Sequence, residues 1–369
     1  MLTITSLRVA RSLLALFVAC SATVASAQAP ALSRLSRTNL LLYRSPGGEV
    51  LPVKNDADWQ KRRAEILAGM QRVMGPLPGA EKRCPLDPQV TEEVDCGDYV
   101  RRSVSYASEP GSRVPAYLLI PKRVLAQSIK APAVLALHQT HSAGQKVVVG
   151  LGNSTNDEYG VELVKRGFVV LATPYTMLAN YWPDVSSLGY QSGTMKSIWD
   201  NMRGLDYLST LPFVKTNGFG AIGHSLGGHN GVYTSVFDER IRVVVSSCGL
   251  DSFLDYGGGD PQVWKPERGW CQLRYMPALT NYAGRLPEIP FDFHELIGAL
   301  APRVCFISAP MGDTNFKWRS VDEIAKAARP VYQLYGVPQH LQVAHPDCGH
   351  LFQAEMREKA YRLLEENLR

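Results

Sequence analysis

The sequence predicts an α/β protein built on a mainly parallel central sheet with helices on both faces. From about residue 99, short continuous apolar segments alternate with helical patterns, which is typical of strands buried on both faces. A Gly-x-Ser-x-Gly pattern lies directly between an apolar strand and a helix, a placement typical of this class. The 369 residues are 45% hydrophobic and 20% charged, so the chain can bury a core and is no disordered polymer.

Charge and cysteine content exclude two further classes. The formal net charge of +5 is small and spread along the chain, so it does not indicate a nucleic-acid-binding protein. Seven cysteines are too few for a scaffold held together by disulfides at this length.

The first 27 residues have the pattern of a signal peptide. Arg8 and Arg11 precede a short apolar run at 12–20, and Ala25-Ser26-Ala27 supplies a small-residue cleavage site. The run is shorter than the ~20 residues that span a bilayer, and we expect no transmembrane span elsewhere. We therefore predict a secreted or periplasmic protein cleaved near Ala27, with a lipoprotein anchor at Cys20 as the minor alternative.

Six cysteines remain after that cleavage, and export permits disulfides. Their positions favour the pairs Cys84–Cys96, Cys248–Cys271 and Cys305–Cys348, and buried free thiols are the alternative.

Three regions are expected along the chain. The signal peptide (1–27) precedes a leader (28–98), whose one helix runs from Asp56 or Asp58 to about Met74, and a catalytic domain (99–369). The strands expected in that domain are 99–106, 116–120, 133–137, 168–172, 219–223, 241–246, 304–308 and 341–344. The expected helices are 158–165, 194–211, 226–237, 321–334 and 354–368.

The alternation stops between residues 249 and 292. This stretch is rich in aromatic residues and glycine, and a loop of its size is uncommon in a compact domain unless it is functional. We expect an insertion that partly roofs an active site, with Trp264 and Trp270 contacting substrate. A stabilising flap without substrate contact is the alternative.

The Gly223-His224-Ser225-Leu226-Gly227 segment predicts a nucleophile on a sharp strand-to-helix turn. Such a turn strains the backbone of the serine, and the two glycines have no Cβ atom to clash with it. The serine hydroxyl then lies at the carboxyl edge of the sheet, where open α/β sheets bind ligands.

A serine nucleophile needs a base and an orienting acid, which follow it in the order Ser, acid, His in this class. His350 lies between the last strand and the last helix and is the expected base, with His345 in reserve. Asp313 follows strand 304–308 and is the expected acid. The other candidates for the acid are Asp347, Asp251 and Asp255.

The oxyanion should be bound by backbone N–H groups. Leu226 follows the nucleophile and supplies the first; the second comes from the loop after strand 133–137, from Gln139 or Thr140. The histidines of these two segments have no carboxylate or cysteine at ligand spacing, so we expect no metal. They are His138, His141, His224 and His229.

These motifs resemble the α/β-hydrolase superfamily, and in particular dienelactone-hydrolase-like, acetyl-xylan-esterase-like and prolyl-oligopeptidase-like catalytic domains. The resemblance covers residue 99 to the end and rests on the Ser225 turn, the Asp313 loop, Gly349-His350 and the strand-end His138. It implies the α/β-hydrolase fold, an acyl-serine intermediate and no cofactor. The chain departs from many relatives at Gln139, where they have glycine, and from dienelactone hydrolase itself by having serine as nucleophile.

We therefore predict a secreted serine hydrolase that cleaves carboxylic esters, with acylated carbohydrate as a candidate substrate and with His138 near that substrate. One alternative is a serine peptidase or amidase that uses the same three residues. The other is a non-catalytic carbohydrate-binding protein on a hydrolase fold. No nucleic-acid partner is expected, and the oligomeric state is left open.

Overall fold

A single large sheet forms the centre of the molecule. The computed structural model describes Leu2 and residues 34–127, 129–152 and 155–369, so the predicted signal peptide, its cleavage site and Cys20 lie outside the described residues. Within these residues nine strands pair in the order β11-β10-β9-β8-β6-β7-β5-β4-β3. Their bounds are Gln89–Asp95 (β3), Tyr99–Glu109 (β4), Ser112–Pro121 (β5), Ala131–Leu137 (β6), Val169–Ala172 (β7), Val214–His224 (β8), Ile241–Ser247 (β9), Val304–Ser308 (β10) and Leu341–Ala344 (β11).

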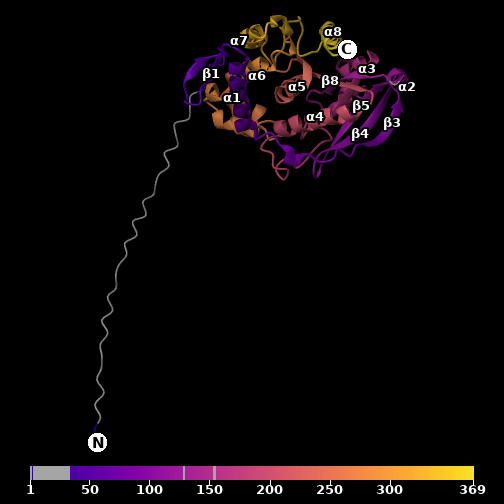
Figure 1. Cartoon of the computed structure of the whole chain (residues 1–369), viewed down its shortest axis with the longest axis horizontal. Coiled ribbons are helices and arrows are strands. Elements are labelled where there is room, and N and C mark those ends of the chain that lie inside the picture. The colour runs from indigo at the N-terminus through magenta and orange to yellow at the C-terminus, as the bar shows by residue number, and fades with distance from the viewer. Residues whose placement is uncertain (1, 3–33, 128, 153–154) are drawn as a thin grey trace. The chain divides into compact units, whose positions relative to one another are not determined.

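The sheet is mainly parallel, as predicted. Strands β7, β6, β8, β9, β10 and β11 pair in parallel, whereas β3, β4 and β5 add an antiparallel end. Figure 1 shows β3, β4 and β5 at one end of the described chain, and α1, α6 and α7 at the other. Because the parallel strands point the same way, the loops that follow them meet at one edge.

Helices pack on both faces of the sheet. They are Asp56–Met74 (α1), Lys122–Gln127 (α2), Tyr159–Lys165 (α3), Gly193–Thr210 (α4), Leu226–Phe237 (α5), Phe293–Leu300 (α6), Trp318–Leu334 (α7) and Ala354–Leu368 (α8). Strand β6 shows why two layers are needed, since all seven of its residues are buried. Leu135 packs into the core formed with α1, α4, α5, α6 and α7, and Val134 into the core formed with α3 and α8.

Most predicted elements are confirmed within a few residues, including α1 and every strand and helix expected after residue 99. Helices α2 and α6 and the strands before residue 99 were missed. These strands are β3 and the short antiparallel pair Leu42–Arg44 (β1) and Val50–Pro52 (β2). A sequence signal for α6 was present, because Asp292 and Glu295 form a capping box at its first turn.

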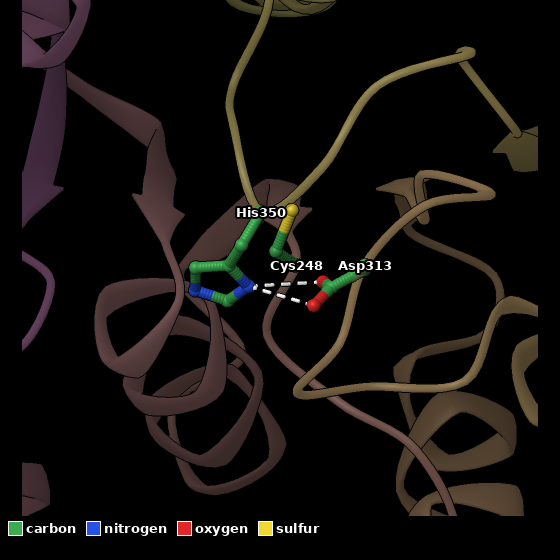
Figure 2. A group of neighbouring side chains, drawn as sticks. All are labelled: Cys248, Asp313 and His350. Carbon is green, nitrogen blue, oxygen red and sulfur yellow. Dashed lines mark hydrogen bonds and ion pairs between the residues drawn. The ribbon is translucent and has the colours of Figure 1, made fainter.

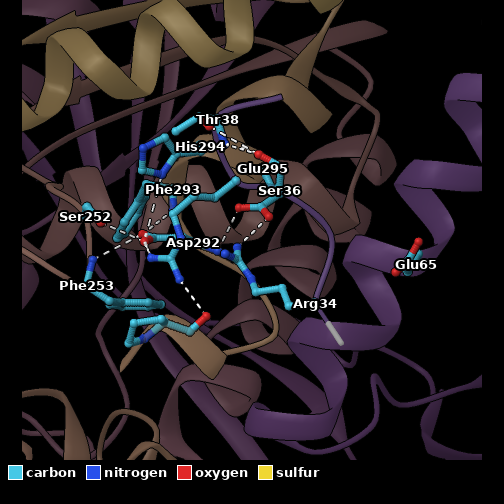
Figure 3. A network of polar contacts seen from close by, with 12 residues as sticks. Arg34, Ser36, Thr38, Glu65, Ser252, Phe253, Asp292, Phe293, His294 and Glu295 are labelled. Carbon is cyan, nitrogen blue, oxygen red and sulfur yellow. Dashed lines mark hydrogen bonds and ion pairs between the residues drawn. The ribbon is translucent and has the colours of Figure 1, made fainter. Parts of the chain in front are cut away.

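A buried ionic cluster ties the first described residues to the start of α6 (Figure 3). Arg37 pairs with Asp292 at 2.6 Å, and Arg34 pairs with Glu295 at 2.5 Å. The Asp292 carboxylate also accepts from the Ser252 hydroxyl at 2.7 Å and from the Phe253 N–H at 3.1 Å. The cluster therefore joins three stretches that are far apart in the sequence.

The cysteine pairing predicted from the sequence is wrong. Cys84, Cys96, Cys248, Cys271, Cys305 and Cys348 are all free, and Cys248, Cys271 and Cys305 are buried. The alternative of buried thiols holds for these three, which pack as small apolar side chains. None of the helices in the described part of the chain is long and apolar enough to cross a membrane.

The Asp292→Ala variant should be strongly destabilised. It leaves the half-buried Arg37 guanidinium without its carboxylate partner and the buried Phe253 N–H without its acceptor. The loss costs up to about 3–5 kcal/mol, the range for fully buried pairs. Urea unfolding followed by circular dichroism measures the change. Glu323→Ala is the control, because Glu323 pairs with Lys326 at the exposed surface. Equal unfolding midpoints for the two variants would contradict this role of Asp292.

Candidate active site

Ser225 lies on a strained turn between β8 and α5. Its φ of 51° falls in the left-handed region that non-glycine residues avoid. The turn is closed from both sides, because a Cβ on Gly223 would overlap the backbone of Gly227, and one on Gly227 would overlap the Leu137 carbonyl. The Ser225 N–H donates to the Ser247 carbonyl at 2.7 Å. The sequence pattern is thus explained by direct backbone contact between the turn and two neighbouring strands.

His350 and Asp313 form a close hydrogen-bonded pair. The Nδ1 atom of His350 lies 3.0 and 2.9 Å from the two Asp313 carboxylate oxygens. Figure 2 shows both oxygens facing this one ring nitrogen, while the other nitrogen points away. Burial favours the neutral acid, yet the pKa of Asp313 is lowered overall because His350 and the N–H groups of Asn315 and Phe316 donate to its carboxylate.

The pair lies beside the Ser225 turn. The ring of His224, the residue before Ser225, packs 4.9 Å from the His350 ring, centroid to centroid. Burial, followed by the charge of His350, lowers the pKa of His224 to about 3, so its ring is neutral. Among the described residues no hydrogen bond joins Ser225 Oγ to His350; contacts of this kind commonly tighten only when substrate binds.

The reserve candidates have other partners. His345 contacts Asp322 and the Ala309 carbonyl, each at 2.8 Å, and Asp347 is exposed. Asp251 accepts from the Lys317 N–H at 3.2 Å, and this contact holds the far end of the loop that carries Asp313. Asp255 lies in the segment after β9 and forms no hydrogen bond or ion pair with His350 among the described residues.

The loop after β6 brings Gln139 and Thr140 to the same edge. His138 fixes this loop, because its Nε2 accepts from the Tyr175 N–H at 3.0 Å and its Nδ1 lies 2.7 Å from the Gln139 carbonyl. Burial lowers the pKa of His138 to about 4, which keeps the ring neutral. The expectation that His138 contacts substrate is therefore wrong, since both its ring nitrogens bind backbone. Thr140 also forms a side-chain hydrogen bond with Tyr275.

Rings from the segment after β9 and from the Asp313 loop form an aromatic wall next to His350. Phe316 packs 6.0 Å from the His350 ring, and Trp270 stacks on Phe316 at 6.5 Å. Tyr256 and Tyr275 contact Trp270 at 5.3 and 4.9 Å. These distances join ring centroids. The sequence had singled out Trp270, but not Phe316, whose position depends on the fold of the Asp313 loop.

Trp264 does not belong to that wall. Its side chain is completely buried and packs edge-on against Phe253 and Tyr256 at 5.8 and 6.0 Å. The prediction of a substrate contact for Trp264 is therefore wrong, because the folded segment uses this ring as its own core.

Cys248 is a further residue that the sequence did not bring to the site. It directly follows β9, and its thiol lies within 4.8 Å of the ligand atoms of Asp313 and His350. The one sequence signal for this placement was the position of Cys248 close behind the predicted strand 241–246.

Comparisons with known proteins relate the chain to esterases of known fold. A family model described as the glucuronyl esterase of fungi matches residues 187–336, which contain Ser225 and Asp313 but not His350. Among solved structures, the glucuronoyl esterase from Solibacter usitatus aligns with a TM-score of 0.69 at 18% identity, over 90% of this chain and 98% of that one. The chain has the α/β-hydrolase fold.

Two curated relatives of this α/β-hydrolase extend the comparison. YtaP of Bacillus subtilis (strain 168), described only as a hydrolase, is 24% identical over 315 residues, which cover 82% of this chain and 99% of that protein. The 4-O-methyl-glucuronoyl methylesterase of Hypocrea jecorina (strain QM6a) is 26% identical over 188 residues. That match covers 45% of this chain and 39% of the fungal enzyme. Together the comparisons indicate a carboxylic ester hydrolase, in agreement with the predicted class.

Stability should fall with rising pH through Asp251. The pKa of the Asp251 carboxyl is raised to about 8 in the folded protein, mainly because the group is buried. In the unfolded chain an aspartic acid loses its proton near pH ~4. Between these values the folded state holds a proton that the unfolded state has lost, so unfolding becomes easier as pH rises and levels off above about 8. Asp251→Asn stays neutral and keeps an oxygen for the Lys317 N–H, so this component should vanish.

Chemical unfolding of both proteins at several pH values between ~5 and ~8 tests the prediction. The advantage of Asp251→Asn over the wild type should grow across this range. A constant difference in the free energy of unfolding would contradict the assignment.

Proposed function

We propose that this α/β-hydrolase cleaves carbohydrate-linked carboxylic esters through an acyl-serine intermediate, with Ser225, His350 and Asp313 as its catalytic residues. The observation that carries the proposal is the Asp313–His350 pair beside the strained Ser225 turn. Serine, acid and base also follow one another in the order typical of this fold.

The proposed reaction begins at Ser225 Oγ, which attacks the ester carbonyl while His350 Nε2 accepts its proton. Asp313 accepts from Nδ1–H, so it holds the imidazole with Nε2 free and stabilises the imidazolium that forms. His350 then returns the proton to the leaving alcohol. Water repeats the sequence on the acyl-enzyme and frees Ser225.

The oxyanion is assigned to two backbone donors, Leu226 N–H and Thr140 N–H. Leu226 is the first residue of α5, and amides at this position have no partner within their own helix. His138 holds the Gln139 carbonyl, so the N–H across the same planar peptide, that of Thr140, points the other way. This orientation favours Thr140 over Gln139 as the second donor. The positive end of the α5 helix dipole also stabilises the negative charge of the oxyanion.

The proposed substrate is an ester of a sugar acid, in which the carbohydrate carries the attacked carbonyl. The family model and the Hypocrea jecorina relative support this choice, because both names refer to glucuronoyl esters. The wall of Trp270, Phe316, Tyr256 and Tyr275 supports it physically, since aromatic faces pack well against sugar rings. An acetylated carbohydrate is the second candidate substrate. In that ester the sugar is the alcohol part and packs against the same wall.

We also propose that the chain is exported and cleaved near Ala27. The basic residues, short apolar run and small residues before the first described segment support this proposal. Extracellular polysaccharide is where such a substrate would be found.

Ser225→Ala should abolish ester hydrolysis and leave the fold intact. The variant keeps the turn but lacks the attacking oxygen, and loss of such a serine reduces kcat by about 10⁶-fold. Turnover of p-nitrophenyl acetate and labelling by a fluorophosphonate probe are the measurements. Ser209→Ala is a matched control, because Ser209 lies near the end of α4 and contacts only the Leu205 carbonyl. Substantial esterase turnover by Ser225→Ala would disprove the nucleophile assignment.

Trp270→Ala should weaken the binding of sugar-acid esters selectively. The buried Trp270 ring contacts Phe316, Tyr256 and Tyr275, so its loss should displace the wall. KM for the methyl ester of glucuronic acid should then rise about tenfold, the equivalent of about 1.4 kcal/mol, whereas hydrolysis of p-nitrophenyl acetate should change little. Trp270→Phe should retain part of the binding, and Trp182→Ala is the control because that ring is 61% exposed. Equal losses on both esters would argue against a sugar-binding role.

A further inference from the structure

Cys248 places a sulfur atom against the Asp313–His350 pair. The Cys248 thiol, a carboxylate oxygen of Asp313 and a ring nitrogen of His350 all lie within 4.8 Å of one another. The three residues come from the loops that follow β9, β10 and β11, and Figure 2 shows them converging on one point. None of the steps proposed for ester hydrolysis uses this thiol.

The three side chains are the ligand types that zinc prefers. Zn²⁺ is bound by cysteine sulfur at about 2.3 Å, by histidine nitrogen at about 2.0–2.1 Å and by carboxylate oxygen at about 2.0–2.2 Å, in tetrahedral geometry. In tetrahedral geometry bonds of these lengths separate neighbouring ligand atoms by about 3.4–3.6 Å. His350 Nδ1 and the Asp313 oxygen, which are 2.9 Å apart, therefore have to move slightly outward, and the Cys248 thiol, which lies within 4.8 Å of both, can move inward. A cluster of this kind is distinct from a group of carboxylates, which attracts Mg²⁺ or Ca²⁺ instead.

The surroundings leave room for a fourth ligand. Cys248 is buried, whereas Asp313 and His350 are half-buried. A second thiol, that of Cys348, lies 4.0 Å from the Leu351 carbonyl, and the Cys248 sulfur lies 3.7 Å from the same oxygen. Cys348 lies outside the group of ligand atoms that are within 4.8 Å of one another, so water is assigned as the fourth ligand.

We propose that Cys248, Asp313 and His350 form an inhibitory site for Zn²⁺, superimposed on the acid–base pair of the enzyme. The inhibitory effect rests on the proposed function, because it requires His350 to be the base. Binding of the ion itself does not depend on that function.

The binding step balances with the release of one proton. Zn²⁺ forms a bond to the Cys248 sulfur, whose S–H proton passes to solvent. It also binds His350 Nδ1, whose proton moves to Nε2 of the same ring. With Nε2 protonated and Asp313 engaged by the metal, His350 can no longer accept the Ser225 proton. Burial, and after it the charge of Asp313, raises the pKa of the Cys248 thiol, so displacing its proton costs part of the binding free energy.

The test is a zinc titration of the whole purified protein in chelator-free buffer. Isothermal titration calorimetry gives stoichiometry and affinity, and p-nitrophenyl acetate hydrolysis gives inhibition. We expect one Zn²⁺ per chain, inhibition that EDTA reverses, and no inhibition by Mg²⁺, which prefers oxygen ligands. In Cys248→Ala the affinity for Zn²⁺ should fall at least about tenfold, with ester hydrolysis retained in the absence of metal.

Cys305→Ala is the matched control, since this buried thiol lies on the adjacent strand β10 and its loss should leave zinc binding unchanged. Zinc affinity that is equal in the wild type and in Cys248→Ala would overturn the proposal. If zinc binds the wild type as described but the protein hydrolyses no ester, the proposed function fails and the metal site stands. Circular dichroism of Cys248→Ala separates a lost ligand from a lost fold.

Discussion

The close backbone contact at the Ser225 turn is the constraint on which the rest of the site depends. Gly227 lies against the Leu137 carbonyl at the end of β6, and Gly223 lies against Gly227 itself, so no side chain fits at either position. This contact fixes the start of α5 relative to β6 and β8. The strain at Ser225 persists because the surrounding sheet holds the turn from several sides.

The other residues of the site reach the Ser225 turn from the ends of the neighbouring strands. Because β6 and β8 to β11 run parallel, their carboxyl ends form one edge of the sheet. The segments that follow these strands carry, in that order, Thr140, Ser225, Cys248, Asp313 and His350. The residues are distant in sequence, but every one follows directly from a strand end. The aromatic wall is different, since it depends on a long segment without regular strands whose rings pack on each other and on Phe316, which in turn packs on His350.

The sequence predicted what local periodicity and turn chemistry determine. The parallel strands, the helices between them, Ser225 and the Asp313–His350 pair all follow from patterns a few residues long, combined with one rule of chain order. Helix α6 was missed because its capping box sits behind an aromatic-rich stretch that masks its period. The roles of Trp264, His138 and Cys248 could not be predicted, because each depends on which neighbours the finished fold places against it.

The Asp292 cluster has a consequence for engineering the aromatic segment. Asp292 binds the Phe253 N–H and the Ser252 hydroxyl, so it joins the two ends of the segment. The middle of the segment is held as well, because the Leu273 and Tyr275 carbonyls accept from the Gly193 and Thr194 N–H groups at the start of α4. A replacement segment designed for a new ester specificity therefore has to keep both ends and these two contacts with α4.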